Sequence, residues 1–484
     1  MAASIIKNLI FASSAKYLGG VIGLAVMAVL ARLIPPEDFG IIAIGSVFIA
    51  FFGMLGDMGL APAVVRFSSF DKEDFRSIFG FTFWIAVLSG VLFYLLSFPI
   101  GMFYGSTELT RVCRWLTLML MFSILNIVPQ NILIRQKRFD IIARRVIVIQ
   151  IIMGALSMFF AFRGWGVDAL LLSSIGTMIL TFAANTWSSR IRPKFVFNKT
   201  PIKIISEFSI FQLLFNIVCY AGQNIDRLVI GKALNISQMA FFDKARNLSL
   251  QPVHNISGVA TSVIYPYLVT HENSTLQRIY SLVLRISFVL SFPISAFCIG
   301  SSRELITLIF GHQWVAAILP FSILSFSIIM EIPHVMEGTI MQTCGHTRQL
   351  FKLGCIKAVI SISSLIIFAG VWKSMEAVCI SVVLSSFSSV LLSIWWIFRE
   401  CFAYRLGIVH LKYVLVPLMN FMAVSLSILL FDRLFWNVGL ISSLIIKLTS
   451  SIVITCLILY CTKYVSWNQM LWLFGRKGVL SVNG

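Results

Sequence analysis

Polar side chains recur at helical spacing in an apolar segment that contains the run YAGQNIDRLVIGK, residues 220–232. At intervals of four, three and four residues, this stripe comprises Asn216, Tyr220, Gln223 and Arg227. Such intervals put side chains on one face of an α-helix. Amides and hydroxyls bind the hydroxyl groups of a ligand, and a guanidinium binds anions. The stripe therefore predicts one wall of a polar ligand site.

A second stripe lies in the next apolar segment. At intervals of three, four and four residues, it comprises Lys244, Asn247, Gln251 and Asn255. Arg246 lies close to this stripe, Arg32 ends the first apolar segment, and Asn126 and Gln130 form a shorter amide pair. Cations combined with amides favour an anionic, hydroxyl-rich ligand.

Four carboxylates in or beside apolar segments are candidates for binding a coupling ion, and they are Asp57, Asp226, Glu331 and Glu337. A carboxylate buried among helices takes up a proton more readily than one in water. The alternative is ion pairing, with a cation such as Arg66 for Asp57 and a neighbouring cation for Asp226. The residue types do not choose between protons and sodium ions.

Sequence motifs for a metal site or an enzyme are weak or missing. His334 and Glu337 lie three residues apart, but two or three ligands on one helix are poor support for a metal. The nine cysteines are scattered, with no C-x-x-C pair. No soluble segment carries a P-loop, D-x-D or G-x-S-x-G motif. We expect no metal, no organic cofactor and no enzyme activity.

The elements that carry these residues are predicted to be membrane helices. The 484-residue chain is 58% hydrophobic and 12% charged, and its mean hydropathy is +0.93. Apolar runs of about 20 residues, the length that crosses a bilayer core, recur throughout. They are continuous rather than alternating, which disfavours a β-barrel. The fold class is therefore all-α and polytopic.

Fourteen spans can be placed, and the first is retained because it ends at RLIPPED rather than at a cleavage site. Their approximate ranges are 9–33, 40–65, 78–102, 113–134, 145–162, 167–187, 206–230, 238–265, 277–299, 314–342, 352–371, 375–398, 409–431 and 440–462. Most of the 38 Lys and Arg residues fall in alternate connections. This pattern predicts that both termini are cytoplasmic, and it explains the net charge of +19 without a nucleic-acid partner.

Two segments 200 residues apart share one plan. ARLIPPEDFGIIAIGSV, residues 31–47, aligns with GKALNISQMAFFDKARN, residues 231–247. Each has a span that ends in a basic residue, a short polar turn and a new apolar run. A parallel repeat of two six-span lobes follows, with residues 1–203 and 204–404 as the lobes. Residues 405–484 would add two spans and a cytoplasmic tail.

The run ARLIPPEDFGIIAIGSVFIAFFGMLGDMGLAPAVVR, residues 31–66, resembles the first two helices of Wzx-type oligosaccharide flippases. These belong to the multidrug/oligosaccharidyl-lipid/polysaccharide superfamily. QNIDRLVIGKALNISQMAFFDKARNL, residues 223–248, is similar to the start of that family's second lobe, and the likeness continues through TIMQTCGHTRQLFKLGCIKAVI, residues 339–360. The resemblance is closest to the colanic-acid-exporter type, WzxC. The sequence departs from the family at FFDKARNL, residues 241–248, where Asp243 and Lys244 are charged.

The resemblance implies two six-helix lobes around a V-shaped cavity in the bacterial inner membrane. It implies alternating access, driven by a proton or sodium gradient, that moves undecaprenyl-pyrophosphate-linked oligosaccharides to the outer leaflet. The surface polysaccharide would be an O-antigen, a capsule or an exopolysaccharide, and the polymerase and export machinery are candidate partners. The basic connections 135–145 and 190–200 are explained by topology, or attract anionic headgroups or a lipid pyrophosphate at the inner leaflet.

Three alternatives stay open at this point. A multidrug-and-toxin-type extruder of small molecules belongs to the same superfamily, although its usual twelve helices fit fourteen spans poorly. The polar stripes have the alternative of hydrogen bonding between helices. Arg227 has the further alternative of extending to the membrane interface.

Overall fold

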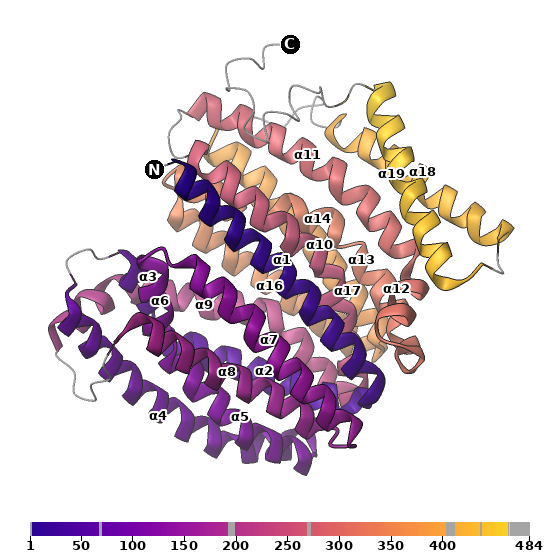
Figure 1. The fold of residues 1–484 in the computed structure, drawn as a ribbon. Helices are drawn as coiled ribbons and strands as arrows, with labels where there is room; N and C mark the ends of the chain where they lie inside the picture. Colours follow the sequence, from indigo (N-terminus) through magenta and orange to yellow (C-terminus); the bar gives the residue numbers. More distant parts are fainter. Residues whose placement is uncertain are drawn as a thin grey trace. The chain divides into compact units, whose positions relative to one another are not determined.

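A computed structural model describes residues 2–66, 70–191, 199–268, 273–402, 412–435, 438–462 and 464, and every regular element in these ranges is a helix (Figure 1). In the first half the helices are α1 (Ala2–Leu33), α2 (Pro36–Asp57), α3 (Leu60–Arg66), α4 (Lys72–Tyr104), α5 (Thr107–Leu125), α6 (Ile127–Arg135), α7 (Phe139–Phe162), α8 (Val167–Ser189) and α9 (Lys199–Ala233). They continue with α10 (Ile236–Leu268), α11 (Asn273–Gly300), α12 (Ser302–Ile309), η1 (His312–Ala317), α13 (Ile318–Ser325), α14 (Ile328–His334), α15 (Glu337–Thr343), α16 (Thr347–Trp372), α17 (Met375–Glu400), α18 (Lys412–Leu434) and α19 (Leu440–Thr462).

The all-helical membrane class is confirmed. Within the described residues, ten helical stretches are long and apolar enough to cross a membrane, and a bent pair of helices makes an eleventh. α9 and α10 are not among them, and the parts whose side chains are described, residues 216–233 and 236–257, carry three charged residues each. The count of fourteen spans therefore stays a prediction.

The chain forms two compact units, residues 1–240 and 241–484. Unit 1 holds α1 to α9 and the first residues of α10, and unit 2 holds the remainder. The predicted six-span lobes with a boundary at residues 203–204 stay a prediction.

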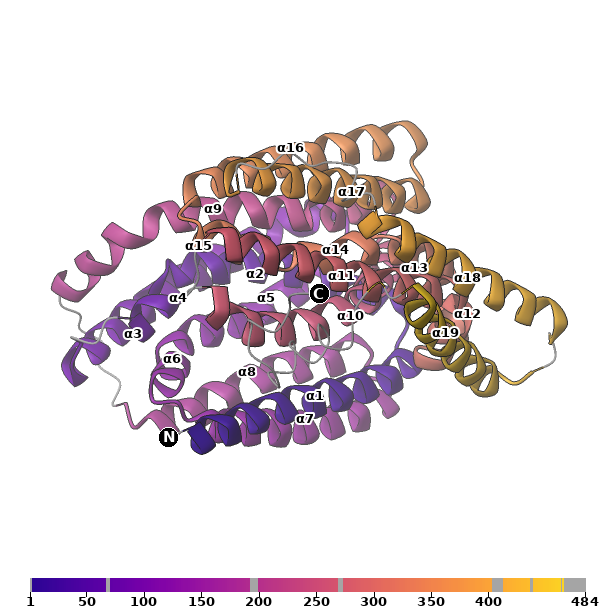
Figure 2. The same ribbon diagram turned by 90° about the horizontal axis from the view of Figure 1, so that it is seen from above.

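Unit 1 is built from pairs of long helices that pack along their lengths. α1 lies along α7, α4 packs against α5, and α2 contacts both α5 and α9 (Figures 1 and 2). A cluster of buried side chains from α3, α4 and α6 closes one end of the unit around Leu60, Phe79 and Val128. α7 turns Ile151, Phe159 and other large apolar side chains outward, as expected of a helix that faces lipid.

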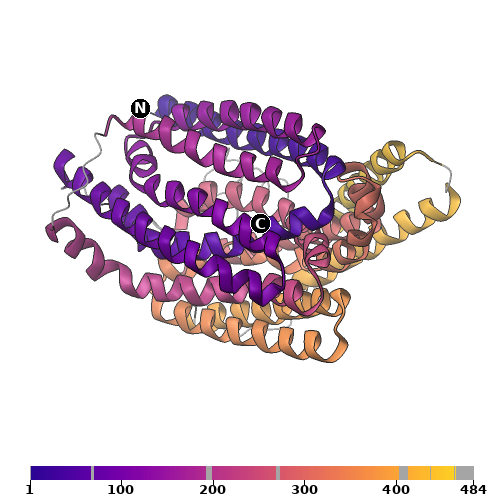
Figure 3. The same ribbon diagram turned by 90° about the horizontal axis from the view of Figure 1, so that it is seen from below.

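Unit 2 combines helix pairs with broken helices. α16 lies beside α17 and α18 beside α19, the orange and gold pairs of Figure 3. Tyr280 of α11, Met336 and Phe398 of α17 are buried in one cluster. α18 is fixed on α11 by Val424 and Ile428, which pack with Ala296.

The predicted second span, 40–65, is not a single helix. α2 ends at Asp57, and both Met58 (φ 43°) and Gly59 (φ 77°) have left-handed backbone conformations that terminate it. The Asp57 carboxylate then accepts a hydrogen bond of 2.9 Å from the backbone N–H of Ala61, which satisfies a donor at the start of α3.

The predicted tenth span, 314–342, is also broken, with a bend of 53° between His312–Ser325 and Ile328–Thr343. At the break, hydroxyl groups donate hydrogen bonds to backbone carbonyls. Ser327 donates to the carbonyl of Leu324 at 2.7 Å, and Ser295 of α11 donates to that of Ser325 at 2.8 Å. Side-chain partners of this kind let an irregular backbone persist at membrane depth.

Candidate functional site

The first polar stripe lies on one continuous helix, α9, as the spacing predicted. Tyr220 uses its hydroxyl to donate a hydrogen bond of 2.5 Å to the carbonyl of Val47 on α2. Its ring lies 6.0 Å from that of Phe51. Asn216 is half-buried and Gln223 is exposed. Tyr220 thus contributes to packing within unit 1, while Gln223 presents its amide at the surface of α9.

The charged pair of α9 is held by its own helix. Asp226 is buried at 6% exposure, and its Oδ1 accepts a hydrogen bond of 2.8 Å from the N–H of Arg227. Arg227 is half-buried, and its Nη1 donates to Asn224 Oδ1 at 3.2 Å. The guanidinium is therefore oriented by an amide one turn away, and its role in binding a ligand stays a prediction.

The second stripe divides along α10. Asp243 and Lys244 are both buried at 8% exposure, whereas Asn247 and Gln251 are exposed. Asn247 donates a hydrogen bond of 2.9 Å to Asp243 Oδ2. Arg246 lies over the ring of Phe242, with 6.0 Å to its centroid. The charged start of the stripe is thus enclosed, and the amides further along are accessible.

The amides of the predicted short pair belong to a network that joins three helices of unit 1. Asn185 of α8 is fully buried, and its Nδ2 donates to Asn126 Oδ1 at 2.7 Å and to Gln130 Oε1 at 2.8 Å. Arg145 of α7 donates from Nη1 to Gln130 Oε1 at 2.9 Å and to Asn185 Oδ1. The network brings together a predicted pair of residues and two that the sequence analysis did not select.

The structure gives each candidate ion-coupling carboxylate a neighbour. Asp57 caps α3, and the side chain of Arg66, its predicted alternative partner, lies outside the described residues. Glu331 accepts a hydrogen bond of 2.8 Å from Ser386. Ion coupling at these carboxylates stays a prediction.

Glu337 has the strongest partner of the four. It is 6% exposed, and both of its oxygens accept hydrogen bonds from Lys357 Nζ, at 2.6 and 2.5 Å. His334 Nδ1 lies 2.7 Å from Glu337 Oε2. Lys357 was expected near a cytoplasmic connection, yet it lies ten residues into α16 and joins this helix to α15. In the described part of the chain, no three His, Cys, Asp or Glu residues are grouped as metal ligands would be.

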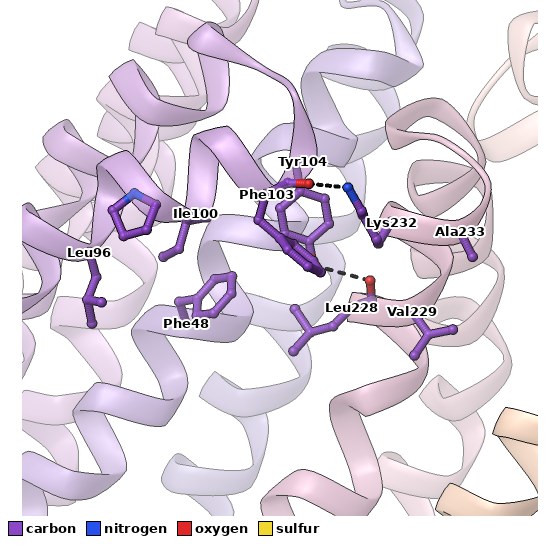
Figure 4. Close-up of a pocket in the computed structure, with 10 residues that line it drawn as sticks. Phe48, Leu96, Ile100, Phe103, Tyr104, Leu228, Val229, Lys232 and Ala233 are labelled. Carbon is purple, nitrogen blue, oxygen red and sulfur yellow. Dashed lines mark hydrogen bonds between the residues drawn. The ribbon is translucent and has the colours of Figure 1, made fainter.

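A pocket of about 490 Å³ lies in unit 1 between α2, α4 and α9. Its lining is apolar apart from Lys232 and the Tyr104 hydroxyl (Figure 4). Tyr104 donates to the carbonyl of Leu228 at 3.2 Å, and Lys232 donates to that of Phe103 (Figure 4). Arg32, the remaining candidate, is exposed near the end of α1.

Unit 2 contains a cluster of charged side chains around a buried lysine, which the sequence analysis did not select. Lys447 of α19 is 1% exposed, and its Nζ lies 2.5 Å from Glu304 Oε1 on α12 and 2.7 Å from Asp432 Oδ1 on α18. The signal available in the sequence was a single lysine inside an apolar span, which calls for a partner. The partners themselves lie in other helices, so their identity required the fold.

Residues 29–319 match the protein family described as "Polysaccharide biosynthesis protein". Among curated proteins, the chain is 24% identical to the teichuronic acid biosynthesis protein TuaB of Bacillus subtilis (strain 168) over 61% of this chain and 62%, less than two thirds, of TuaB. It is 22% identical to the succinoglycan biosynthesis transport protein ExoT of Rhizobium meliloti (strain 1021), over 68% of this chain and 67% of ExoT.

The likeness is not specific to the colanic-acid-exporter type that the sequence analysis expected. The lipopolysaccharide biosynthesis protein WzxC of Escherichia coli (strain K12) is 20% identical over 72% of this chain and 71% of WzxC. That identity is no higher than the values for TuaB and ExoT. The supported grouping is therefore the wider set of polysaccharide biosynthesis transport proteins.

Two solved structures show the same fold. The inward closed conformation of the lipid II flippase MurJ aligns with a TM-score of 0.75 and 14% identity, covering 93% of this chain and 98% of MurJ. An inward-facing multidrug resistance transporter of the MATE family aligns with a TM-score of 0.61 and 16% identity, covering 78% of this chain and 93% of the transporter.

Proposed function

Because the chain belongs to the polysaccharide biosynthesis protein family and is a membrane transporter rather than an enzyme, we propose that it is a flippase for lipid-linked oligosaccharides. It moves undecaprenyl-pyrophosphate-linked repeat units from the inner to the outer leaflet of the bacterial inner membrane. The units then enter surface polysaccharide synthesis. The observation that carries this proposal is a polysaccharide biosynthesis sequence on the fold of a lipid II flippase.

The arrangement that suits this task is two six-helix lobes and two further helices, fourteen spans in all, with both termini in the cytoplasm. Alternating access, coupled to a proton or sodium gradient, exposes the bound substrate first to one leaflet and then to the other. The exposed amides of α9 and α10 suit sugar hydroxyls, and the half-buried Arg227 and Arg246 suit the pyrophosphate.

The test uses a strain that lacks this gene. Lipid-linked repeat units should accumulate on the cytoplasmic face of its inner membrane, and surface polysaccharide should fall to a small fraction of the wild-type amount. Re-expression of the wild-type chain should restore both. Normal delivery of repeat units to the outer face in the deletion strain, with no second transporter of this family, would refute the proposal.

The alternative is a multidrug-and-toxin-type extruder, which shares the fold. The same deletion strain separates the two. If the protein is a small-molecule extruder, the deletion strain should be more sensitive to cationic dyes such as ethidium, with unchanged surface polysaccharide. If it is a flippase, surface polysaccharide should fall and dye sensitivity should not change.

A further inference from the structure

Arg145 lies inside a membrane helix rather than in the basic connection to which the sequence analysis assigned it. α7 begins at Phe139, before the apolar run, so Arg145 is six residues into the helix. At 1.5 Å per residue this places it roughly 9 Å along the helix axis. The side chain is half-buried. A charge in this position usually faces a bundle interior or a water-filled path.

Neutral amides alone orient the Arg145 guanidinium. Nη1 donates to Gln130 Oε1 at 2.9 Å and to Asn185 Oδ1. Asn185 is in turn fixed by its hydrogen bonds to Asn126 and Gln130, at 2.7 and 2.8 Å. Helices α6 and α8 therefore hold the guanidinium in one orientation. Because the acceptors are neutral amides, they do not neutralise its positive charge.

Two other cations that join helices of the described chain have carboxylate partners. Arg111 pairs with Glu108 and Asp168, and Lys357 pairs with Glu337. Arg145 makes no ion pair with any described carboxylate, and its Nε is buried without a hydrogen-bond acceptor. Both of its hydrogen bonds come from Nη1 and go to neutral amides, so Nη2 and Nε can still donate to an anion.

We infer that Arg145 binds the pyrophosphate group of the lipid-linked substrate within unit 1, an inference that rests on the proposed function. The planar guanidinium forms paired hydrogen bonds with phosphate oxygens. Pyrophosphate supplies the negative charge that this cation lacks in the bundle. The neighbouring Arg144 is exposed, and Arg138 donates to the carbonyl of Ser188 at 3.2 Å, so neither has this amide setting.

The inference is tested with the full-length protein in detergent micelles and with farnesyl pyrophosphate as the probe, titrated by calorimetry. Farnesol, titrated in parallel, corrects for partition of the prenyl chain into the micelle. Arg145→Gln removes the charge. Gln130→Glu is the decisive variant, since its oxygens can accept the same hydrogen bonds while its carboxylate neutralises the guanidinium. Arg144→Gln is the matched control.

Both Arg145→Gln and Gln130→Glu should weaken binding of farnesyl pyrophosphate at least about tenfold, because charge-assisted hydrogen bonds are lost. Arg144→Gln should change it less than about twofold by the same measure, since it removes only an exposed charge. Folding is checked by the elution volume and the melting temperature. If Arg145→Gln fails to fold, Gln130→Glu decides alone, because a network that serves only packing predicts unchanged binding in that variant.

Several titration results would overturn the inference. These are wild-type binding by a folded Arg145→Gln or by Gln130→Glu, no measurable binding of the probe by the wild-type protein, and equal displacement of the probe by the headgroup lipid phosphatidylglycerol. Measuring repeat-unit delivery in cells shows whether only the role of Arg145 is wrong or whether the proposed flippase function is wrong as well. A wild-type chain that delivers repeat units while Gln130→Glu does so equally well refutes the role of Arg145 and leaves the flippase proposal intact.

Discussion

At the scale of single residues, this chain uses intramembrane charges in two different ways. Lys447 and Lys357 are neutralised by buried carboxylates, Glu304 and Glu337, and these pairs join helices. Arg145 is surrounded by amides, and Arg227 donates to the amide of Asn224. We expect the pairs of Lys447 and Lys357 to control stability and Arg145 to control transport.

Replacement of Lys447 by Met should lower the free energy of unfolding by about 3–5 kcal/mol, because it leaves Glu304 buried without its counter-charge. The melting temperature of the detergent-purified protein measures this effect. Asp432→Asn is the control, since the Asp432 side chain is 46% exposed and its loss should cost no more than about 1 kcal/mol. Lys447→Met/Glu304→Gln should recover part of the loss. Equal melting of Lys447→Met and the wild type would contradict this account.

Replacement of Arg227 by Gln should reduce delivery of repeat units at least about tenfold while the protein stays folded, since the cation proposed to bind the pyrophosphate is lost. Quantification of surface polysaccharide in the complemented deletion strain measures this. Arg114→Gln is the matched control, because Arg114 is exposed and lies over the ring of Tyr94 at 5.5 Å. Full delivery by Arg227→Gln would assign Arg227 to helix packing or to the membrane interface.

At the scale of helices, close packing depends on small residues at particular positions. A Cβ at Gly40 of α2 would lie 2.1 Å from the backbone oxygen of Ile236, at the start of α10. A rotamer change cannot relieve the clash of a side chain at this position, because the opposing atom belongs to the backbone. The pair therefore needs glycine where these two helices meet.

Gly40→Ala should destabilise the protein by about 1–3 kcal/mol through overpacking, seen as a lower melting temperature. Gly53→Ala, in the same helix, meets no atom within 4 Å. It should leave the melting temperature unchanged or slightly higher, because alanine is the better helix former. If the two variants melt together, the contact at Gly40 does not limit packing.

The sequence predicted where most long helices lie because apolar length is a local property. Predicted spans 375–398 and 440–462, for example, coincide with α17 and α19 to within two residues. It did not predict the breaks after Asp57 and Ser325, since these depend on a left-handed Met58 and on the hydroxyl of Ser295 from another helix. Hydropathy alone does not encode such partners.

The candidate site was predictable in part. The four residues of the first stripe all belong to α9, the single helix that their spacing predicted, and Asn126 and Gln130 both accept hydrogen bonds from Asn185. It overlooked Arg145 and Asn185, because α7 begins before its apolar run and because a single amide shows no spacing. The hydrogen bonds of Arg145 go to amides of α6 and α8, so they become visible only in the folded bundle.

At the scale of the whole molecule, the fold of MurJ extends over 93% of the chain, although identity is 14%. Packing between apolar helices tolerates many exchanges of similar volume, so the fold persists after the sequence has diverged. The fold alone therefore does not determine what is transported. This explains why one fold accompanies both flippases and multidrug transporters.

The predicted topology places the two ends of α7 on opposite sides of the membrane. In a variant without native cysteines, Trp165→Cys should react with an impermeant maleimide in intact cells, and Gln136→Cys should react only after the cells are opened. Both wild-type residues are exposed in the connections that flank α7. Labelling of Gln136→Cys in intact cells would invert the predicted orientation.

The ion pairs of Lys447 fix α19, a helix that also carries two exposed thiols. Of the nine cysteines, only Cys456 and Cys461 are exposed, and both belong to α19, the helix that Lys447 ties to α12 and α18. A spin label or fluorophore on either thiol would be carried by unit 2 rather than by a loosely tethered helix. Distances measured spectroscopically from a label on Cys456 or Cys461 can therefore report movements of unit 2 without an engineered cysteine in that unit.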